Sequence, residues 1–341
     1  MSTTHLIRIA AISMFFAGCS TPLIAGWTAT YLHPTGYLSS YALDASNGRI
    51  VGAAFGPAPF RTEHAVMWAG TAASCVDLHP TGSTFSFASS IDGNEQAGCS
   101  SDHAGTWSGT AASWVDLDPL GTHGTTFVAD CSGGQQVGAH RDAGPVSATH
   151  ACMWSGTEVS FVDLNPAGCE SSGAYGVSGG QQVGEAYGSA TGNYGHASLW
   201  AGTAASWVDL NPAMYGSSVA CDISDGQVSG WASTSLYGRP RHAGIWNGTA
   251  ASAWVDLNPA GCDESEALRT SAGKQAGYAK GTATGGKYHA GIWSGAAASW
   301  TDLHGLLSAT YTGSRAHGID AVGEEIWVLG SAYNATAKED Q

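Results

Sequence analysis

The chain has 341 residues, of which 48 are glycine and 11% are charged, and its formal net charge at pH 7 is −15. Such a composition disfavours long helices and favours short strands joined by tight turns. Because 27 acidic residues outnumber 12 Lys and Arg residues, most of the surface repels a phosphate backbone, which excludes nucleic acid as a partner.

Residues 1–26 have the pattern of an export segment with a short linker. An apolar run from Ile9 to Ala17 is too short to span a bilayer as a finished helix. The run leads into Ala17-Gly18-Cys19-Ser20, which resembles the lipobox of bacterial lipoproteins and implies cleavage before Cys19 and its lipidation. A plain secretory signal or an irregular N-terminal segment is the alternative. We therefore expect an extracellular or cell-envelope protein, such as an outer-membrane lipoprotein, that meets the membrane only through this lipid.

Six near-identical units follow, and each contains His-Ala-x-x-Trp and then Asp-Leu. Two further apolar segments precede each histidine and are separated by glycine-rich turns, as in residues 174–184, which is typical of β-hairpins. Each unit therefore supplies four strands, and four-stranded units of roughly 40 to 50 residues are the blades of propellers. The repeated residues are His64, His103, His150, His196, His242 and His289, with Trp68, Trp107, Trp154, Trp200, Trp246 and Trp293.

The two ends of the chain predict how the ring closes. Residues 28–36 match the last strand of a unit but have no unit in front of them, whereas residues 316–330 provide first strands without a last one. We expect these segments to pair, which would remove the open sheet edges that favour aggregation. The prediction is an all-β propeller of seven four-stranded blades closed by the N-terminal strand, as one monomeric domain over residues 27–333 with a tail at 334–341. Three origins stay open for the third strand of the last blade: it starts at Tyr333, it is formed by residues 23–27, or it is missing.

The unit Gly-x-Gln-Val-Gly, His-Ala-x-x-Trp and Asp-Leu resembles the HAF repeats of bacterial extracellular proteins, over nearly the whole chain after Trp27. The sequence departs from that pattern in having Asn-Pro-x-Gly where the family often has Gly-Thr-Leu-Gly-Gly. It also has Trp alone where the family often has Phe-x-Trp. The resemblance implies a propeller-like fold and an extracellular location, and it implies no particular activity.

The repeated His and Trp residues are predicted to be structural. Equivalent positions of a ring lie far apart and cannot share one ion, so we expect each His to bond a hydroxyl, a carbonyl or the repeated Asp, and each Trp to pack between blades. The cysteines after Cys19 form no Cys-x-x-Cys pair and are expected to be buried or to form one or two disulfides. Motifs of hydrolases, metalloproteases and phosphate-binding loops are absent from the sequence. The sequence thus predicts no catalytic residue, no metal and no cofactor.

The connections between second and third strands are long and variable in five units, and they carry aromatic and basic residues. This pattern favours an exported, non-enzymatic binding or scaffold protein that presents a loop face to a glycan or a cell-surface protein. The alternatives are a polysaccharide hydrolase or lyase with a site at the channel mouth, and longer hairpins with solvated charges. The predicted binding residues are Tyr187, Tyr194, Trp231, Tyr237, Arg239, Arg241, Tyr278, Lys287 and Tyr288.

Overall fold

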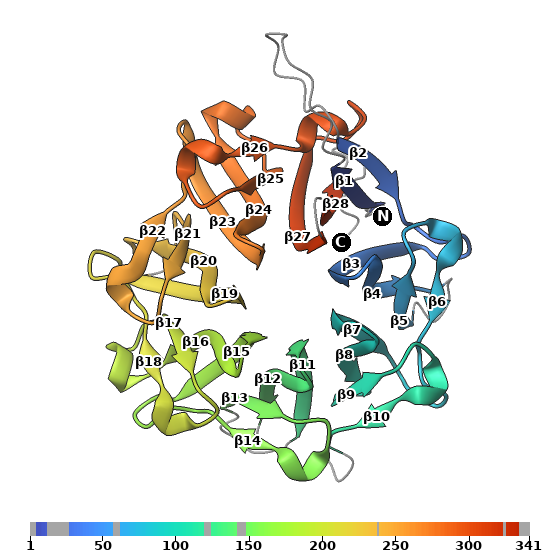
Figure 1. Cartoon of the computed structure of the whole chain (residues 1–341), viewed down its shortest axis with the longest axis horizontal. Coiled ribbons are helices and arrows are strands. Elements are labelled where there is room, and N and C mark those ends of the chain that lie inside the picture. Colours follow the sequence, from blue (N-terminus) through green and yellow to red (C-terminus); the bar gives the residue numbers. More distant parts are fainter. Residues whose placement is uncertain are drawn as a thin grey trace.

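The computed structural model shows a β-propeller, in which seven four-stranded antiparallel sheets surround a central axis (Figure 1). It describes residues 5–11, 27–56, 62–118, 124–141, 148–236, 239–322 and 325–333. The all-β propeller predicted from the repeats is therefore confirmed. None of the helices in these residues has the length and apolarity needed to cross a bilayer.

Six of the sheets are blades built from one contiguous stretch of chain each: blade 1 (β3–β6), blade 2 (β7–β10), blade 3 (β11–β14), blade 4 (β15–β18), blade 5 (β19–β22) and blade 6 (β23–β26). The first strand of each blade lies nearest the axis (Figure 1). The first strands are β3 (Ser39–Ser46), β7 (Ser86–Asp92), β11 (Thr125–Ser132), β15 (Ser171–Ser178), β19 (Ser217–Ser224) and β23 (Cys262–Ser271). The second strands are β4 (Arg49–Phe55), β8 (Glu95–Ser100), β12 (Gln135–Arg141), β16 (Gln181–Tyr187), β20 (Gln227–Ser233) and β24 (Lys274–Gly281).

The outer half of each blade contains the repeated motifs. The third strands carry His-Ala-x-x-Trp and are β5 (Glu63–Trp68), β9 (His103–Trp107), β13 (Thr149–Trp154), β17 (His196–Trp200), β21 (His242–Asn247) and β25 (His289–Trp293). The fourth strands carry the repeated Asp and are β6 (Val76–Asp77), β10 (Val115–Asp116), β14 (Val162–Asp163), β18 (Val208–Asp209), β22 (Trp254–Asp256) and β26 (Thr301–Asp302).

Single-turn 3-10 helices occupy several connections. Those between third and fourth strands are η1 (Ala72–Ser74), η2 (Ala111–Ser113), η3 (Glu158–Ser160), η5 (Ala204–Ser206), η6 (Ala251–Ala253) and η8 (Ala297–Ser299). The others are η4 (Ser189–Thr191), η7 (Thr282–Thr284) and η9 (His304–Leu306). In most of the first group a serine in the last position caps the turn, as Ser160 Oγ accepts the Ser155 amide at 2.7 Å.

The seventh sheet combines both ends of the chain, in the order β2-β1-β28-β27. Its strands are β27 (Gly313–Val322), β28 (Glu325–Tyr333), β1 (His5–Ala11) and β2 (Trp27–Tyr31). The predicted direct pairing of residues 28–32 with residues 316–330 is therefore wrong, because β1 pairs with β28 on one side and with β2 on the other. None of the three origins expected for the third strand is the observed one. The expected boundary between an export segment at residues 1–26 and a propeller from residue 27 would place β1 outside the sheet in which it lies.

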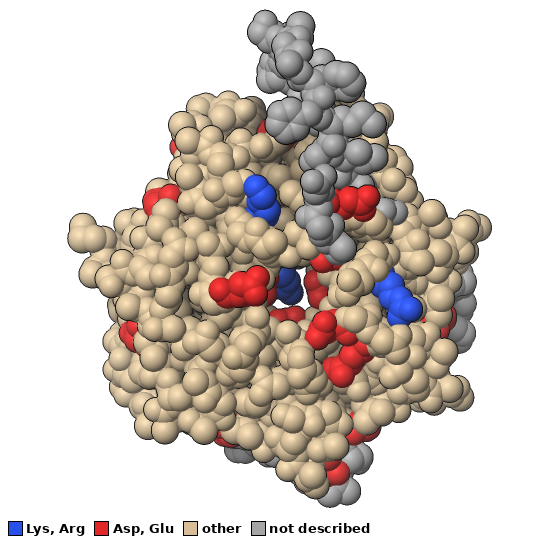
Figure 2. Space-filling model, in the orientation of Figure 1, with Lys and Arg blue, Asp and Glu red and all other residues tan. Residues whose placement is uncertain are grey.

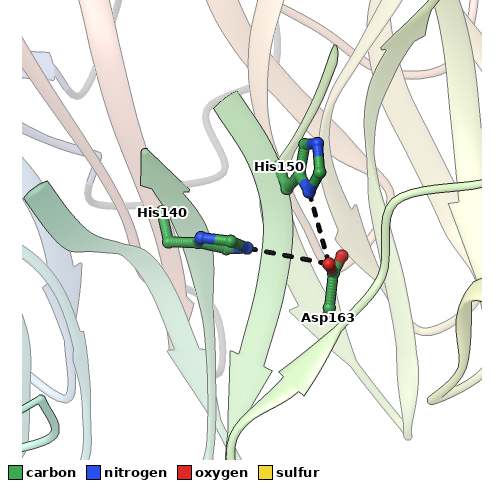
Figure 3. Close-up of side chains that lie close together, drawn as sticks. All are labelled: His140, His150 and Asp163. Atoms are coloured by element: carbon green, nitrogen blue, oxygen red, sulfur yellow. Dashed lines mark hydrogen bonds and ion pairs between the residues drawn. The ribbon is translucent and has the colours of Figure 1, made fainter. Parts of the chain in front are cut away.

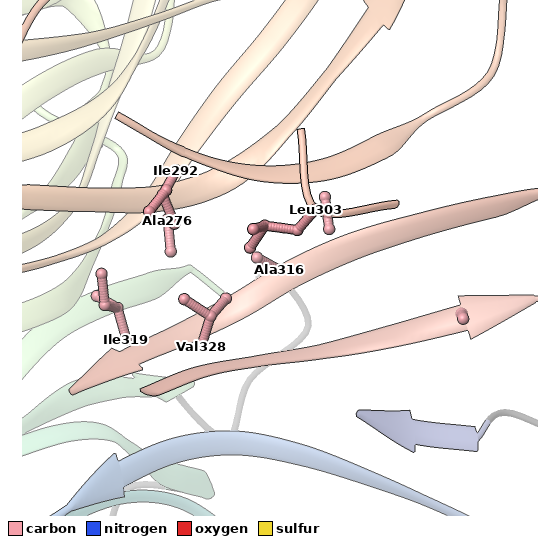
Figure 4. Packing of buried hydrophobic residues seen from close by; sticks show 8 residues of the cluster. Ala276, Ile292, Leu303, Ala316, Ile319 and Val328 are labelled. Carbon is pink, nitrogen blue, oxygen red and sulfur yellow. The ribbon is translucent and has the colours of Figure 1, made fainter. Parts of the chain in front are cut away.

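The motif tryptophans lie between blades and are at most 1% exposed. Trp200 of blade 4, for example, packs on Val137, Ala151 and Met153 of blade 3. The composite sheet packs on blade 6 through smaller side chains, among them Ile292, Leu303, Ile319 and Val328 (Figure 4). The seven cysteines in the described residues form no disulfide, and five of them are buried. Of the two expectations for the cysteines, the structure therefore agrees with buried side chains and not with disulfides between blades.

A glycine in each second strand allows its close approach to the first. A Cβ on Gly138 would lie 1.9 Å from the Phe127 carbonyl oxygen, and a Cβ on Gly184 would lie 1.9 Å from that of Gly173. The glycine of Gln-Val-Gly is thus a steric requirement of the blade. A β-bulge follows at the same level of each first strand, as between Val128 and Asp130. The bulge turns the next residue toward the axis.

Candidate functional site

The repeated histidines form one hydrogen-bonded pair in each of the six blades. Their Nδ1 atoms lie 2.6 to 3.2 Å from the carboxylates of Asp77, Asp116, Asp163, Asp209, Asp256 and Asp302. In blade 3 burial alone would raise the pKa of Asp163, but hydrogen bonds from His140, the Asn165 amide and His150 lower it to about 2.

The same network joins neighbouring blades. Ser172, on the first strand of blade 4, accepts the Ala151 amide of blade 3 at 3.0 Å and donates to Asn165 Oδ1 at 2.7 Å. The five other blades each bond a hydroxyl of the next sheet in the same way, at Ser86, Thr126, Ser218, Ser265 and Ser314. The motif histidines thus bond the repeated Asp within each blade, which is one of the partners that the sequence predicts, and the serine and threonine hydroxyls connect neighbouring blades.

The axial channel is a cavity of about 190 Å³ lined by the residues that follow the bulges. Figure 2 shows acidic side chains around the central opening of one face and a basic side chain within it. The carboxylates of Asp44, Asp130 and Asp222 each accept a backbone amide of the next blade along the chain, at 2.8 to 2.9 Å. They therefore tie blade to blade on the channel side.

Burial raises the pKa of these channel carboxyls. The pKa of Asp130 rises to about 6, through burial and the nearby Asp44, and that of Asp222 rises to about 7, mainly through burial. Ser90 Oγ lies 2.9 Å from Asp44 Oδ2 and 2.6 Å from Asp130 Oδ1. A hydroxyl has one proton to donate, so the second short contact requires a carboxyl proton. The geometry thus agrees with one protonated carboxyl between Asp44 and Asp130.

The predicted loop-face residues are mostly engaged within the protein. Trp231 is 8% exposed and Tyr278 is 5% exposed, so neither ring offers a face to a ligand. Arg241 lies 4.1 Å above the Trp231 ring and bonds Glu266 Oε1 at 2.7 Å. The prediction that Trp231, Arg241 and Tyr278 bind a ligand is therefore wrong. Their segments begin inside strands β20 and β24, where the sequence placed loops.

The remaining predicted residues do not come together as one site. Arg239 and Tyr288 both bond the carboxylate of Glu264. Lys287 is exposed and Tyr194 half-buried, each just after a 3-10 turn. Tyr237 and the lipidation candidate Cys19 lie outside the described residues. Tyr187 borders a sizeable cavity.

That cavity has a volume of about 490 Å³ and lies between blades 3 and 4; we call it the open cleft. Blade 3 contributes the side chains of its strand ends, and blade 4 contributes a carboxylate and two phenol rings. The lining residues are Phe127, Ala139, Thr149, Ser171, Ser172, Gly173, Tyr175, Glu185, Tyr187 and Gly195.

The strand register explains why this cleft is open. Ala139 and Trp231 hold equivalent positions, each opposite the alanine of His-Ala on the third strand. Thr149 and Arg241 both precede the motif histidine, and Gly173 and Glu266 both follow the serine that joins the blades. The space between blades 5 and 6, which we call the filled cleft, contains Trp231, Arg241 and Glu266. Three smaller residues leave the corresponding space between blades 3 and 4 empty.

The open cleft has an ordered polar wall. The Tyr175 hydroxyl donates to Glu185 Oε1 at 2.7 Å, and burial together with this carboxylate raises the pKa of Tyr175 above its ordinary value. The phenol therefore stays protonated and holds the carboxylate in place. Beside Glu185 Oε2, Gly195 has no side chain, and a Cβ there would lie only 3.3 Å from that oxygen. In the part of the chain that the structure describes, no Lys or Arg is among the lining residues.

No protein-family model matches this sequence, and no curated protein matches it. Among solved structures, one from a study of two prolyl endopeptidases and their inter-domain dynamics has a TM-score of 0.51 at 10% identity, over 83% of this chain and 45% of that chain. A puromycin hydrolase has a TM-score of 0.40 at 12% identity, over 81% and 57%. The β-propeller domain of the trilobed protease from Pyrococcus furiosus has a TM-score of 0.42 at 8% identity, over 79% and 98%.

This likeness establishes the propeller fold alone, and the chain spans about half the length of the prolyl endopeptidase and the puromycin hydrolase. The predicted function is nevertheless wrong. The solved structure with the higher TM-score is a peptidase, not a glycan-binding or surface-protein-binding scaffold and not a polysaccharide hydrolase or lyase. The burial of Trp231 and Tyr278 also removes two of the aromatic side chains on which that prediction depended.

Proposed function

We propose that the protein binds a ligand bearing a guanidinium group in the open cleft between blades 3 and 4. One observation carries the proposal. In two other clefts of the ring the chain's own arginines fill the space: Arg241 stacks on Trp231 and pairs with Glu266, and Arg315 lies 4.7 and 4.3 Å from the rings of Tyr278 and Tyr288. In the open cleft a carboxylate comes from another position, Glu185, and three aromatic rings are present, but no arginine is among the described lining residues.

The chemistry of the cleft fits this ligand. A carboxylate pairs with a guanidinium through charge-assisted hydrogen bonds, and aromatic rings attract a cation over their faces. Glu185 supplies the carboxylate, and Tyr175, Tyr187 and Phe127 supply rings. A volume of about 490 Å³ lies within the range of roughly 300–1,000 Å³ for small-molecule sites. The formal charge of −15 also favours the approach of cations.

Calorimetric titration of the purified full chain tests the proposal. Agmatine and free arginine are one source of the group, and a short arginine peptide is the other, so these titrations distinguish a metabolite from a peptide. The matching citrulline peptide is the neutral control. We expect saturable binding of at least one guanidinium ligand and none of citrulline.

Variants assign the binding to the cleft. Glu185→Gln should weaken it about 10-fold or more, because a charge-assisted hydrogen bond contributes roughly 1.5–3 kcal/mol. Asp225→Asn removes the same unit of charge on an exposed turn between β19 and β20 and should leave binding unchanged. Equal binding of citrulline, or an equal loss in both variants, would overturn the proposal.

We further propose that the sheet of β27, β28, β1 and β2 acts as a seventh blade that closes the ring. Export through residues 1–26, with Cys19 lipidated, remains a prediction, as does the HAF-repeat resemblance. The two proposals exclude each other, because cleavage before Cys19 would remove β1. Mass spectrometry of the N-terminus of the cell-derived protein decides between them. A chain that starts at a lipidated Cys19 leaves that sheet without its third strand.

A further inference from the structure

Blade 3 departs from the other blades at its rim, where a second histidine faces the repeated His-Asp pair (Figure 3). His140 on β12 lies directly opposite His150 on β13, and Asp163 lies on β14. The corresponding second-strand residues opposite the motif histidine are small in the other five blades: Ala54, Ser100, Ala186, Ala232 and Ala279. Among the described residues, blade 3 alone brings a histidine from its second strand to the pair; the second histidines of blades 1 and 6, His79 and His304, stack on the motif histidines instead.

The three side chains point toward one another. Asp163 Oδ2 lies 3.2 Å from His150 Nδ1 and 3.9 Å from His140 Nε2 (Figure 3). The donor atoms of the three residues all lie within 4.8 Å of one another, and in the described part of the chain this is the one cluster of its kind. Tetrahedral zinc with bonds near 2.0–2.1 Å separates its ligand atoms by about 3.3 Å. Small side-chain movements would therefore bring all three onto one ion.

The surroundings hold the ligands and leave one side accessible. His140 is 5% exposed and packs edge-on against Phe161 and His150, with ring centroids 5.2 and 5.3 Å apart. Asp163 Oδ1 accepts the Asn165 amide at 2.7 Å, which fixes the carboxylate and leaves Oδ2 on the side of the histidines. The Asp163 side chain is 46% exposed, so an ion and a water molecule can reach it. This is the positioning that metal ligands need.

We infer that His140, His150 and Asp163 form a binding site for a divalent transition-metal ion of the zinc class. Two imidazoles and one carboxylate suit zinc and cobalt, whereas magnesium and calcium prefer oxygen ligands alone. Three protein ligands also leave a fourth position for water, as in zinc sites of the open type. This inference departs from the expectation of no metal site, which weighed only the repeated histidines, because His140 is outside the repeat.

The test uses the full chain without an affinity tag, stripped with a chelator and then titrated with zinc chloride or cobalt chloride. We expect one ion per chain and the visible absorption bands of tetrahedral cobalt. His140→Ala, which introduces the alanine of four other blades, should weaken binding by about 100-fold or more and abolish the bands. Asp163→Asn, which keeps the size of the side chain, should also weaken metal binding.

His103→Asn is the matched control, because it changes the equivalent pair in blade 2, where Ser100 replaces the second histidine. It should leave the stoichiometry and the cobalt spectrum unchanged. Circular dichroism shows whether each variant is folded. The inference is overturned if the wild type binds no more zinc than His140→Ala does. It is also overturned if His103→Asn loses as much metal affinity as His140→Ala.

Discussion

The open cleft and the filled cleft are equivalent spaces of one repeat, yet one is a cavity and the other is solid. On the channel side both are held in the same way, by Asp130 bonding the Val177 amide and by Asp222 bonding the Thr270 amide. They differ in the layer above, where Trp231, Arg241 and Glu266 are replaced by Ala139, Thr149 and Gly173. A repeat fold can thus create a binding site by omitting side chains while the connections between blades are kept.

Removal of the tryptophan from the filled cleft should have the largest effect. Trp231→Ala deletes a buried ring that packs with Val219, Cys221 and Arg241, and we expect a loss of about 3–5 kcal/mol in the free energy of unfolding. Tyr187→Ala at the rim of the open cleft should cost less than about 1 kcal/mol, because that ring is 39% exposed. Urea denaturation measures both values. Similar losses would mean that the two clefts do not differ in packing.

Replacement of the arginine in the filled cleft should have the next largest effect on stability. Arg241→Ala leaves Glu266, which is 4% exposed, without its cationic partner, and we expect a loss of roughly 2–3 kcal/mol. Thr149→Ala at the equivalent position should change stability by less than about 0.5 kcal/mol. If the unpaired charge of Glu266 causes the loss of stability in Arg241→Ala, the double variant Arg241→Ala, Glu266→Gln should recover part of that stability. A double variant as unstable as the sum of both single changes would contradict this explanation.

The glycine spacing and the phase of the tryptophans predict the blades because they are needed in every repeat, as the close approach at Gly138 shows. The third strand of the composite sheet could not be predicted in the same way. Residues 5–11 carry no repeat motif, and their apolar character also fits a signal segment. The open cleft results from side chains that are missing, at Ala139 and Gly173, and a search for conspicuous residues overlooks such positions. Glu185 and His140 were recognisable only as departures from their counterparts in other blades.

The channel carboxylates predict a pH dependence shared by both clefts. Asp130 and Asp222 have folded-state pKa values of about 6 and about 7, above the ordinary value of 3.8. The folded state therefore binds these protons more tightly than the unfolded chain does. Their contribution to stability is complete below about pH 4 and is lost as the pH rises through 6 to 7. We expect a decrease of roughly 4 kcal/mol between pH 5 and 8 from these two groups, at about 1.4 kcal/mol for each pH unit over which a carboxyl is protonated in the folded state alone.

Urea denaturation of the wild type and of Asp130→Asn with Asp222→Asn isolates this effect from other titrating groups. Asparagine keeps an oxygen that can accept the Val177 and Thr270 amides but cannot ionise. The double variant should show a flatter pH profile than the wild type. Parallel profiles would show that the two carboxyls do not hold their protons in the folded state.

The smallest change in stability should come from filling the open cleft. Ala139→Trp places in blade 3 the residue that blade 5 has at Trp231, and its ring would enter the cavity of about 490 Å³. Burial of the ring and the strain of fitting it offset each other, so we expect stability within about 1 kcal/mol of the wild type. The same variant should lose guanidinium binding, because the ring takes the space of the ligand. Ala53→Trp, at the equivalent and fully buried position of blade 1, is the control and should destabilise by about 1–3 kcal/mol or more. If the two variants are equally destabilised, or if Ala139→Trp binds the ligand normally, the open cleft is not the space that distinguishes blades 3 and 4.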